Sequence, residues 1–214
     1  MVDINEQQHF PEVVFVFSGK RKSGKDFVAE KLKETLGHNR CDIIRLSGPL
    51  KYEYARQHGL EFDRLLDSTT YKELYRQDMI CWGEEKRRAD PTYFCKLATK
   101  MVSSTIREGS QTVQKPVWVI SDARRKSDVH YFKTSYEKVV HVRIAASEDV
   151  RKSRGWMFTA GIDDAESECG LDDETFDFVI HNDGHDHEQL NNEINYLLKK
   201  PDDRKENSED VSWN

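Results

Sequence analysis

The 214-residue chain lacks the features that define several classes of protein. No apolar run approaches the roughly 20 residues that a membrane-spanning helix needs, so membrane insertion is not expected. The four cysteines are widely spaced and form no C-x-x-C pair, which argues against a zinc site or a disulfide framework and favours reduced thiols. The histidines of "HNDGHDH" (181–187) also lack the spacing of metal ligands.

An excess of positive charge is missing too. The chain holds 33 Lys and Arg against 39 Asp and Glu, and its formal net charge is −6. It contains no nucleic-acid recognition motif, so nucleic-acid binding is not expected. Hydrophobic residues make up 36% of the chain, which suffices for one domain. No apolar surface stripe is left over for a partner, so we expect a monomer.

Both ends of the sequence are polar. Residues 1–11 have neither the basic nor the apolar region of a secretory signal, and are expected to form a flexible leader. Residues 201–214 are rich in charge and are expected to form a disordered tail. The final "SWN" is not a peroxisomal tripeptide of the S-K-L kind, so a cytosolic location is expected.

Strands and helices alternate along the rest of the chain. Strands are expected at 12–19, 42–48, 116–125, 138–146 and 175–184. Helices are expected at 24–37, 49–59, 70–90, 91–109, 126–137, 147–156 and 187–200. No hairpin signal joins neighbouring strands, so the sequence predicts an α/β fold with a parallel sheet sandwiched by helices. We expect one domain over 12–200, with a core of 12–58 and 113–200 and a helical insertion at 59–112.

A phosphate-binding loop is predicted where "FSGKRKSGKDF" (17–27) follows the apolar run "VVFVF". Gly19, Gly24 and Lys25 fit the pattern G-x-x-x-x-G-K, with a strand before it and a helix after it. The loop residues between them are Lys20, Arg21, Lys22 and Ser23. Backbone N–H groups and the helix start would hold phosphate oxygens, and Lys25 would reach the β- and γ-phosphates of a nucleotide.

Two acidic residues are candidates for Mg²⁺ ligation. Asp26 stands where such loops usually carry Ser or Thr, and its carboxylate is also a hard oxygen ligand. Asp26 also fits an acid that merely favours a helix start. Asp122 lies at the end of the strand "VWVIS", where a second carboxylate for the metal is expected.

Arginines follow several of the expected strands. Arg124 and Arg125 lie at the carboxyl end of a parallel strand, which faces the ligand crevice, although surface salt bridges would also explain them. Arg151 and Arg154 share one face of a helix that is expected to belong to a lid over about 147–170, or else to be a solvent-exposed helix. The acidic "DDAESECGL" (163–171) is expected to hold this lid or to pair with its arginines.

Two further positions fit either a ligand-binding role or simple exposure to solvent. Asn182, after the last strand, is a candidate for hydrogen bonding to an adenine edge. One of the cations in "EEKRRAD" (84–90) could meet a substrate carboxylate, although such a run is usually a solvated face.

Several motifs together resemble the animal-type phosphomevalonate kinases over about residues 12–198. They are "FSGKRKSGKDFV", "RLSGPLK", "STYKE", "DMICWGEEKR", "SDARRKSDV", "SRGWMFTAGIDDAESECGLD" and "FDFVIHNDG". The resemblance implies a P-loop fold of the nucleoside-monophosphate-kinase type. It implies Mg·ATP-dependent phosphorylation of (R)-5-phosphomevalonate to the diphosphate, in the mevalonate route to isoprenoids and sterols.

The resemblance also implies roles for individual residues. Lys25 would be the main catalytic lysine, Arg21 and Lys22 would line the phosphate channel, and Asp26 would lie near the metal and the acceptor. Arg124 and Arg125 would bind the acceptor phosphate and the transition state, and Arg87 would contact the acceptor. The residues expected to clamp ATP are Arg143, Arg151 and Arg154, with Asn182 near the base; Arg143 is also a candidate for the substrate side.

Two other functions stay open at this point. The first is another small-molecule or deoxynucleotide kinase of the same fold. A base-reading pocket would distinguish a nucleotide kinase, and the sequence of 59–112 identifies none. The second is a non-catalytic ATP-binding protein, which would not need Lys25, Asp122 and the paired arginines.

Overall fold

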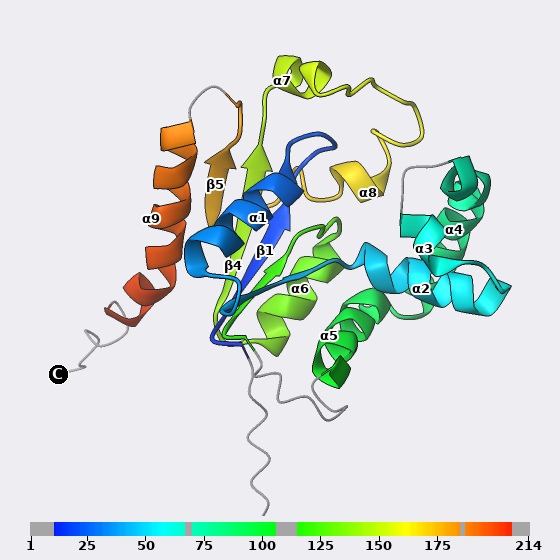
Figure 1. Cartoon of the computed structure of the whole chain (residues 1–214), viewed down its shortest axis with the longest axis horizontal. Coiled ribbons are helices and arrows are strands. Elements are labelled where there is room, and N and C mark those ends of the chain that lie inside the picture. Colours follow the sequence, from blue (N-terminus) through cyan, green and yellow to red (C-terminus); the bar gives the residue numbers. More distant parts are fainter. Residues whose placement is uncertain (1–10, 67–69, 106–114, 185–186, 207–214) are drawn as a thin grey trace, which may run out of the picture.

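A five-stranded parallel sheet forms the centre of the protein (Figure 1). The computed structural model describes residues 11–66, 70–105, 115–184 and 187–206. The strands, in the spatial order β2-β3-β1-β4-β5, are β2 Cys41–Ile44, β3 Val117–Ile120, β1 Val13–Ser18, β4 Val139–Ala145 and β5 Phe178–His181. All four strand pairs are parallel, with Phe15 beside Val119 on one side and beside Val140 on the other.

Helices follow most of the strands. Their bounds are α1 Lys25–Leu36, α2 Ser47–His58, α3 Phe62–Leu66, α4 Thr70–Ala89, α5 Tyr93–Thr105, α6 Lys126–Ser135, α7 Glu148–Ser153, α8 Glu166–Cys169 and α9 His187–Glu206. The expected α/β fold with a helix-covered parallel sheet is therefore confirmed.

The two faces of the sheet are covered by different helices. β1 is buried along its whole length, because a parallel strand has helices on both sides. On one face, Phe15 and its neighbours pack against Leu32 of α1 and Ile194 of α9. On the other face, Val16 and its neighbours pack against Ala98 of α5 and Phe132 of α6. These two layers fix the loops that leave the sheet.

A third cluster lies apart from the sheet, where α2, α3 and α4 pack together (Figure 1). Tyr54 of α2, Leu65 of α3 and Met79 of α4 are its buried members. The helical region thus begins with α2, which we expected to pack with the core. α5, expected within the insertion, instead covers the sheet. The short α3 was not expected from the sequence.

Some element boundaries differ from expectation. β3 ends at Ile120, because residues 121–125 already turn toward α6. α9 continues to Glu206 through Pro201, so residues 201–206 are helical where a disordered tail was expected. The expected leader at 1–10, the helix end at 106–109 and the tail at 207–214 lie outside the described residues. Among the described helices, none has the length and apolar character that crossing a membrane requires.

The strand order determines where a ligand can bind. β1 lies between β3 and β4, so the loops after β1, β3 and β4 leave the sheet side by side at its carboxyl edge. In open α/β sheets this is the place where the connections diverge and a crevice forms. The loop at 19–24, the turn at 121–125 and α7 follow these three strands.

Candidate active site

The loop between β1 and α1 requires glycine at its end. Gly24 has a φ of 87°, in the left-handed region, and a Cβ there would lie 2.2 Å from Nδ2 of Asn182. That amide donates a hydrogen bond to the carbonyl of Ser23 at 2.8 Å, and Nη1 of Arg154 donates to the same carbonyl at 3.2 Å. The loop backbone is therefore held from behind by the segments after β5 and α7.

Lys25 lies in the curve of this loop. Its ammonium donates to the carbonyls of Gly19 at 2.8 Å and Lys20 at 3.3 Å. Burial lowers the pKa of Lys25 from its ordinary value to about 7; Arg124 lowers it further, and the carboxylates of Asp26 and Asp122 oppose this. An anion that binds beside this partly buried ammonium would therefore stabilise its charged form.

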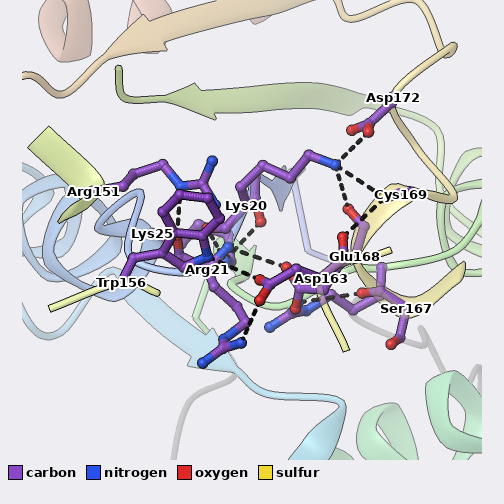
Figure 2. Close-up of polar contacts among 12 residues, drawn as sticks. Lys20, Arg21, Lys25, Arg151, Trp156, Asp163, Ser167, Glu168, Cys169 and Asp172 are labelled. Atoms are coloured by element: carbon purple, nitrogen blue, oxygen red, sulfur yellow. Dashed lines mark hydrogen bonds and ion pairs between the residues drawn. The ribbon is translucent and has the colours of Figure 1, made fainter. Parts of the chain in front are cut away.

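Residues 163–172, which we call the acidic segment, bind the cations of the loop (Figure 2). Nη1 of Arg21 donates to Asp163 at 2.8 Å, and the backbone N–H of Arg21 donates to Oε2 of Glu168 at 3.1 Å. The ammonium of Lys20 donates to the carbonyl of Glu168 at 3.1 Å and pairs with Asp172. Glu168 thus accepts from a loop N–H, a kind of donor that a phosphate would use.

Two more arginines meet the acidic segment, one from the turn after β3 and one from β4. Arg124 pairs with Oε1 of Glu168 and donates to the carbonyl of Ser167 at 3.2 Å, and burial lowers its pKa. Nη2 of Arg143 donates to Asp172 at 2.8 Å. The acidic stretch was expected to hold the lid or to pair with its arginines. Trp156 and Thr159 of the expected lid do donate to Asp163. The arginines that pair with the acidic segment, among them Arg21, Arg124 and Arg143, come from outside this lid.

The segment around α7 lies over the loop (Figure 2). Nε of Arg151 donates to the carbonyl of Arg21 at 2.8 Å, and its guanidinium lies 4.0 Å from the ring centroid of Trp156. The indole N–H of Trp156 donates to Asp163 at 2.9 Å. Burial alone would raise the pKa of Asp163, but hydrogen bonds from Trp156 and Thr159 and the charge of Arg21 hold it below its ordinary value. The carboxylate is thus kept ionised.

A second group of cations lies beside the helical region. Nη1 of Arg125 donates to Glu166 at 2.8 Å, and Nη2 pairs with Glu84 of α4. Arg87 of α4 points to the same place, with its guanidinium 4.8 Å from the ring centroid of Phe94. A cavity of about 260 Å³ opens here, lined by Glu84, Arg87, Arg88, Pro91, Arg125, Ser127 and Glu166. The structure therefore brings Arg87 and Arg125 to one cavity, and their expected contact with an acceptor stays a prediction.

The two expected metal ligands have different surroundings. The side chain of Asp26 is 71% exposed and accepts from Nε of Arg45 at 3.4 Å. Asp122 accepts the backbone N–H groups of Leu46 at 2.6 Å and Ser47 at 3.0 Å, which fixes the start of α2. Within the described residues, no cluster of three His, Cys, Asp or Glu side chains forms a metal site. Two carboxylates beside Lys25 still fit Mg²⁺, which takes most of its ligands from phosphates and water.

Asn182 is placed differently from its expected role. Its side chain is buried and donates to the loop, so it positions backbone, and its contact with a base stays a prediction. A cavity of about 390 Å³ lies next to it, lined by Asp149, Val150, Ser153, Arg154, Asp183 and Gly184. Nη2 of Arg154 also donates to the carbonyl of Asn182 at 2.8 Å.

The sequence reasoning missed two basic residues near the site. Arg45, directly after β2, contacts Asp26. Lys51 of α2 has a pKa lowered by burial and by Lys72, opposed by Asp122. The signal was available, because both residues lie in "RLSGPLK" (45–51), which spans the end of one expected strand and the start of the next expected helix.

Comparisons with known proteins identify the family of the chain. The family model "Phosphomevalonate kinase" matches residues 17–138. The phosphomevalonate kinase of Drosophila melanogaster is 43% identical over 192 residues, which cover 87% of this chain and 95% of the relative. Solved structures with similar folds include a gluconokinase from Sinorhizobium meliloti 1021 (15% identity, 92% of this chain and 98% of that chain, TM-score 0.48) and the dephospho-CoA kinase of Campylobacter jejuni (12%, 91% and 100%, 0.46). By its sequence, the chain belongs to the phosphomevalonate kinase family.

Proposed function

We propose that the protein transfers the γ-phosphoryl group of ATP to the phosphate of (R)-5-phosphomevalonate, giving (R)-5-diphosphomevalonate and ADP, in isoprenoid and sterol synthesis. Family membership supports the acceptor. One observation carries the proposal. A glycine-bounded loop, the partly buried Lys25 and several arginines lie together at the carboxyl edge of the sheet.

The chemistry suits a site made of cations. The attacking group is a phosphate oxygen that is already ionised near neutral pH, so no general base is needed. Catalysis then consists of positioning the two phosphates and neutralising their clustered negative charge. The transferred group would be stabilised by Lys25, Arg21 and Arg124. The charges of these residues interact where the loop lies beside the carboxyl ends of β3 and β4.

The acceptor would occupy the cavity beside the helical region. Arg87 and Arg125 line it, and a guanidinium can bind a phosphate or a carboxylate through two parallel hydrogen bonds. Arg124 would lie between this cavity and Lys25, in contact with the acceptor phosphate during transfer. Lys22 and Arg143 would add positive charge at the edge of the phosphate channel.

The nucleotide would bind across the P-loop, whose residues Gly19, Lys20, Ser23 and Gly24 form the phosphate-binding backbone. Arg151 and Arg154 would approach its phosphates, since both already contact loop carbonyls. The base would extend toward the cavity of about 390 Å³ beside Asn182. Mg²⁺ bound by Asp26 and Asp122 with the phosphates would neutralise charge on the β- and γ-oxygens.

The acidic segment would have to release its cations before reaction. Its carboxylates pair with Lys20, Arg21 and Arg124, the groups that phosphates need. We propose that residues 147–170 form a lid over ATP, and that the acidic segment, which includes the end of this lid, exchanges its contacts with the loop cations as the phosphates enter. We further propose a monomer in the cytosol; light scattering after gel filtration and microscopy of a tagged protein test these two points.

A coupled ADP-release assay tests the function. The protein is given Mg·ATP with phosphomevalonate, mevalonate, CMP, UMP or dTMP in parallel reactions. Turnover with phosphomevalonate alone is the expected result. Turnover with a nucleotide instead would assign a nucleotide kinase on the same fold, and ATP binding without any turnover would assign a non-catalytic binder.

A further inference from the structure

Asp128 is a fully buried carboxylate behind the acceptor cavity. It lies in the first turn of α6, which begins directly after Arg124 and Arg125, and its side chain is 1% exposed. Oδ2 accepts the backbone N–H groups of Arg124 at 3.0 Å and Arg125 at 3.1 Å. This oxygen alone completes the start of the helix and fixes the backbone of the arginine pair.

The other oxygen of Asp128 binds a different element. Oδ1 accepts from Nη1 of Arg87 at 3.2 Å and from the thiol of Cys95 at 3.5 Å. Arg87 belongs to α4 and lies 41 residues earlier in the chain. A helix start does not need this second oxygen, because at this third helical position an amide side chain, with a single acceptor oxygen, fulfils the same role. The second oxygen therefore has a separate use.

A buried carboxylate is costly unless it is fully paired, so its partners indicate what it is for. The four donors that reach Asp128 come from three elements, α4, α5 and the turn before α6. Three of the donors belong to the arginines of the acceptor side. Arg87 uses one of its five N–H groups on Asp128, which leaves the others for a ligand in the cavity of about 260 Å³.

We propose that Asp128 is a positioning residue for the acceptor, and that its Oδ1 holds the Arg87 guanidinium at the angle that binds the acceptor anion. The proposal rests on the proposed function, because it takes the cavity beside Arg87 and Arg125 as the acceptor site. Asp128 does not touch the substrate. It acts through Arg87, and its burial keeps it in place when the acidic segment moves.

Asp128→Asn tests the proposal with one atom changed. The amide oxygen still accepts the N–H groups of Arg124 and Arg125, while the amide NH₂ now faces two donors, Arg87 and Cys95. We expect kcat/KM for phosphomevalonate to fall by about 10- to 100-fold, mainly through KM, as for the loss of a hydrogen bond between charged groups. KM for ATP should stay within about twofold. Asp63→Asn, an exposed acid of α3, is the matched control and should change neither constant.

Asp128→Ser guards against a folding defect of the asparagine variant. It also keeps one oxygen near the helix start and loses the second, so it should shift the acceptor KM in the same direction. Thermal unfolding of both variants shows whether they fold. Acceptor KM values within twofold of the wild type, or equal losses for ATP and acceptor, would overturn the positioning role.

A double-mutant cycle with Arg87→Ala separates positioning from general stability. If Asp128 acts through Arg87, adding Asp128→Asn to Arg87→Ala should lower kcat/KM for the acceptor by less than about twofold. A multiplicative loss would contradict the proposal. If the wild type does not turn over phosphomevalonate, the proposed function itself has failed, and the cycle is measured with whichever acceptor the panel identifies.

Discussion

The two sides of the site hold their cations with carboxylates of different kinds. On the loop side, Lys20 and Arg21 are bound by the acidic segment, whose residues come more than 140 positions later in the chain. On the acceptor side, Arg87 and the backbone of Arg125 are bound by Asp128, a buried residue of α6. Where phosphates must enter, the carboxylates of the acidic segment can be exchanged for phosphate. Where arginines must keep their orientation, a buried carboxylate holds them in place.

Replacement of Lys25, the central cation of the loop side, should have the largest effect on the rate. Lys25→Met should lower kcat by at least about 10³-fold, because the ammonium of Lys25 would neutralise charge on the transferred phosphoryl group from inside the loop. The fold should survive, since the ammonium contacts loop carbonyls and not the core. Lys33→Met, also on α1 but outside the site, is the control in the ADP-release assay. A variant within tenfold of the wild type would remove Lys25 from its proposed role.

The next largest effect should be the change of kcat/KM for ATP with pH. Because the pKa of Lys25 in the ligand-free protein is lowered to about 7, the ammonium is charged below that pH and loses its proton above it. Phosphate binds the charged form, so kcat/KM for ATP should fall by up to about tenfold per pH unit above 7 to 8. Arginine stays charged throughout this range. Lys25→Arg should therefore abolish this decline, and an unchanged decline would assign it to another group.

Removing a carboxylate should have opposite effects on the two sides. Glu168→Gln takes away a charge that competes with phosphate for Arg124, so ATP should bind several-fold more tightly, most clearly at low ionic strength. Asp128→Asn should instead weaken acceptor binding. Calorimetric titration with ATP and with phosphomevalonate checks both directions. Glu166→Gln, whose exposed carboxylate meets Arg125, is the control for the nucleotide titration. Weaker ATP binding by Glu168→Gln would mean that the acidic segment supports the loop.

The loop was predictable because its features are local. Strand, glycines, lysine and helix follow one another within 25 residues, and each has its own sequence signal. The counter-charges were not predictable in the same way. Asp128 looks like an ordinary acid in a first helical turn, and only the fold brings Arg87 to its second oxygen. The packing of α2 with α3 and α4 likewise depends on contacts that no short pattern encodes.

Asp26 is neither a carboxylate of the acidic segment nor a buried one like Asp128, and its replacement should have the smallest effect on activity. Its side chain is exposed and accepts a long contact from Arg45, so serine should fit its place without loss of stability. If Asp26 binds Mg²⁺, Asp26→Ser should raise the Mg²⁺ concentration for half-maximal rate by several-fold, because a neutral hydroxyl binds the ion more weakly than a carboxylate. Asp42→Ser, on β2 away from the loop, is the control. An unchanged Mg²⁺ profile with a raised acceptor KM would place Asp26 on the acceptor side, and it would then count among the groups that position the acceptor.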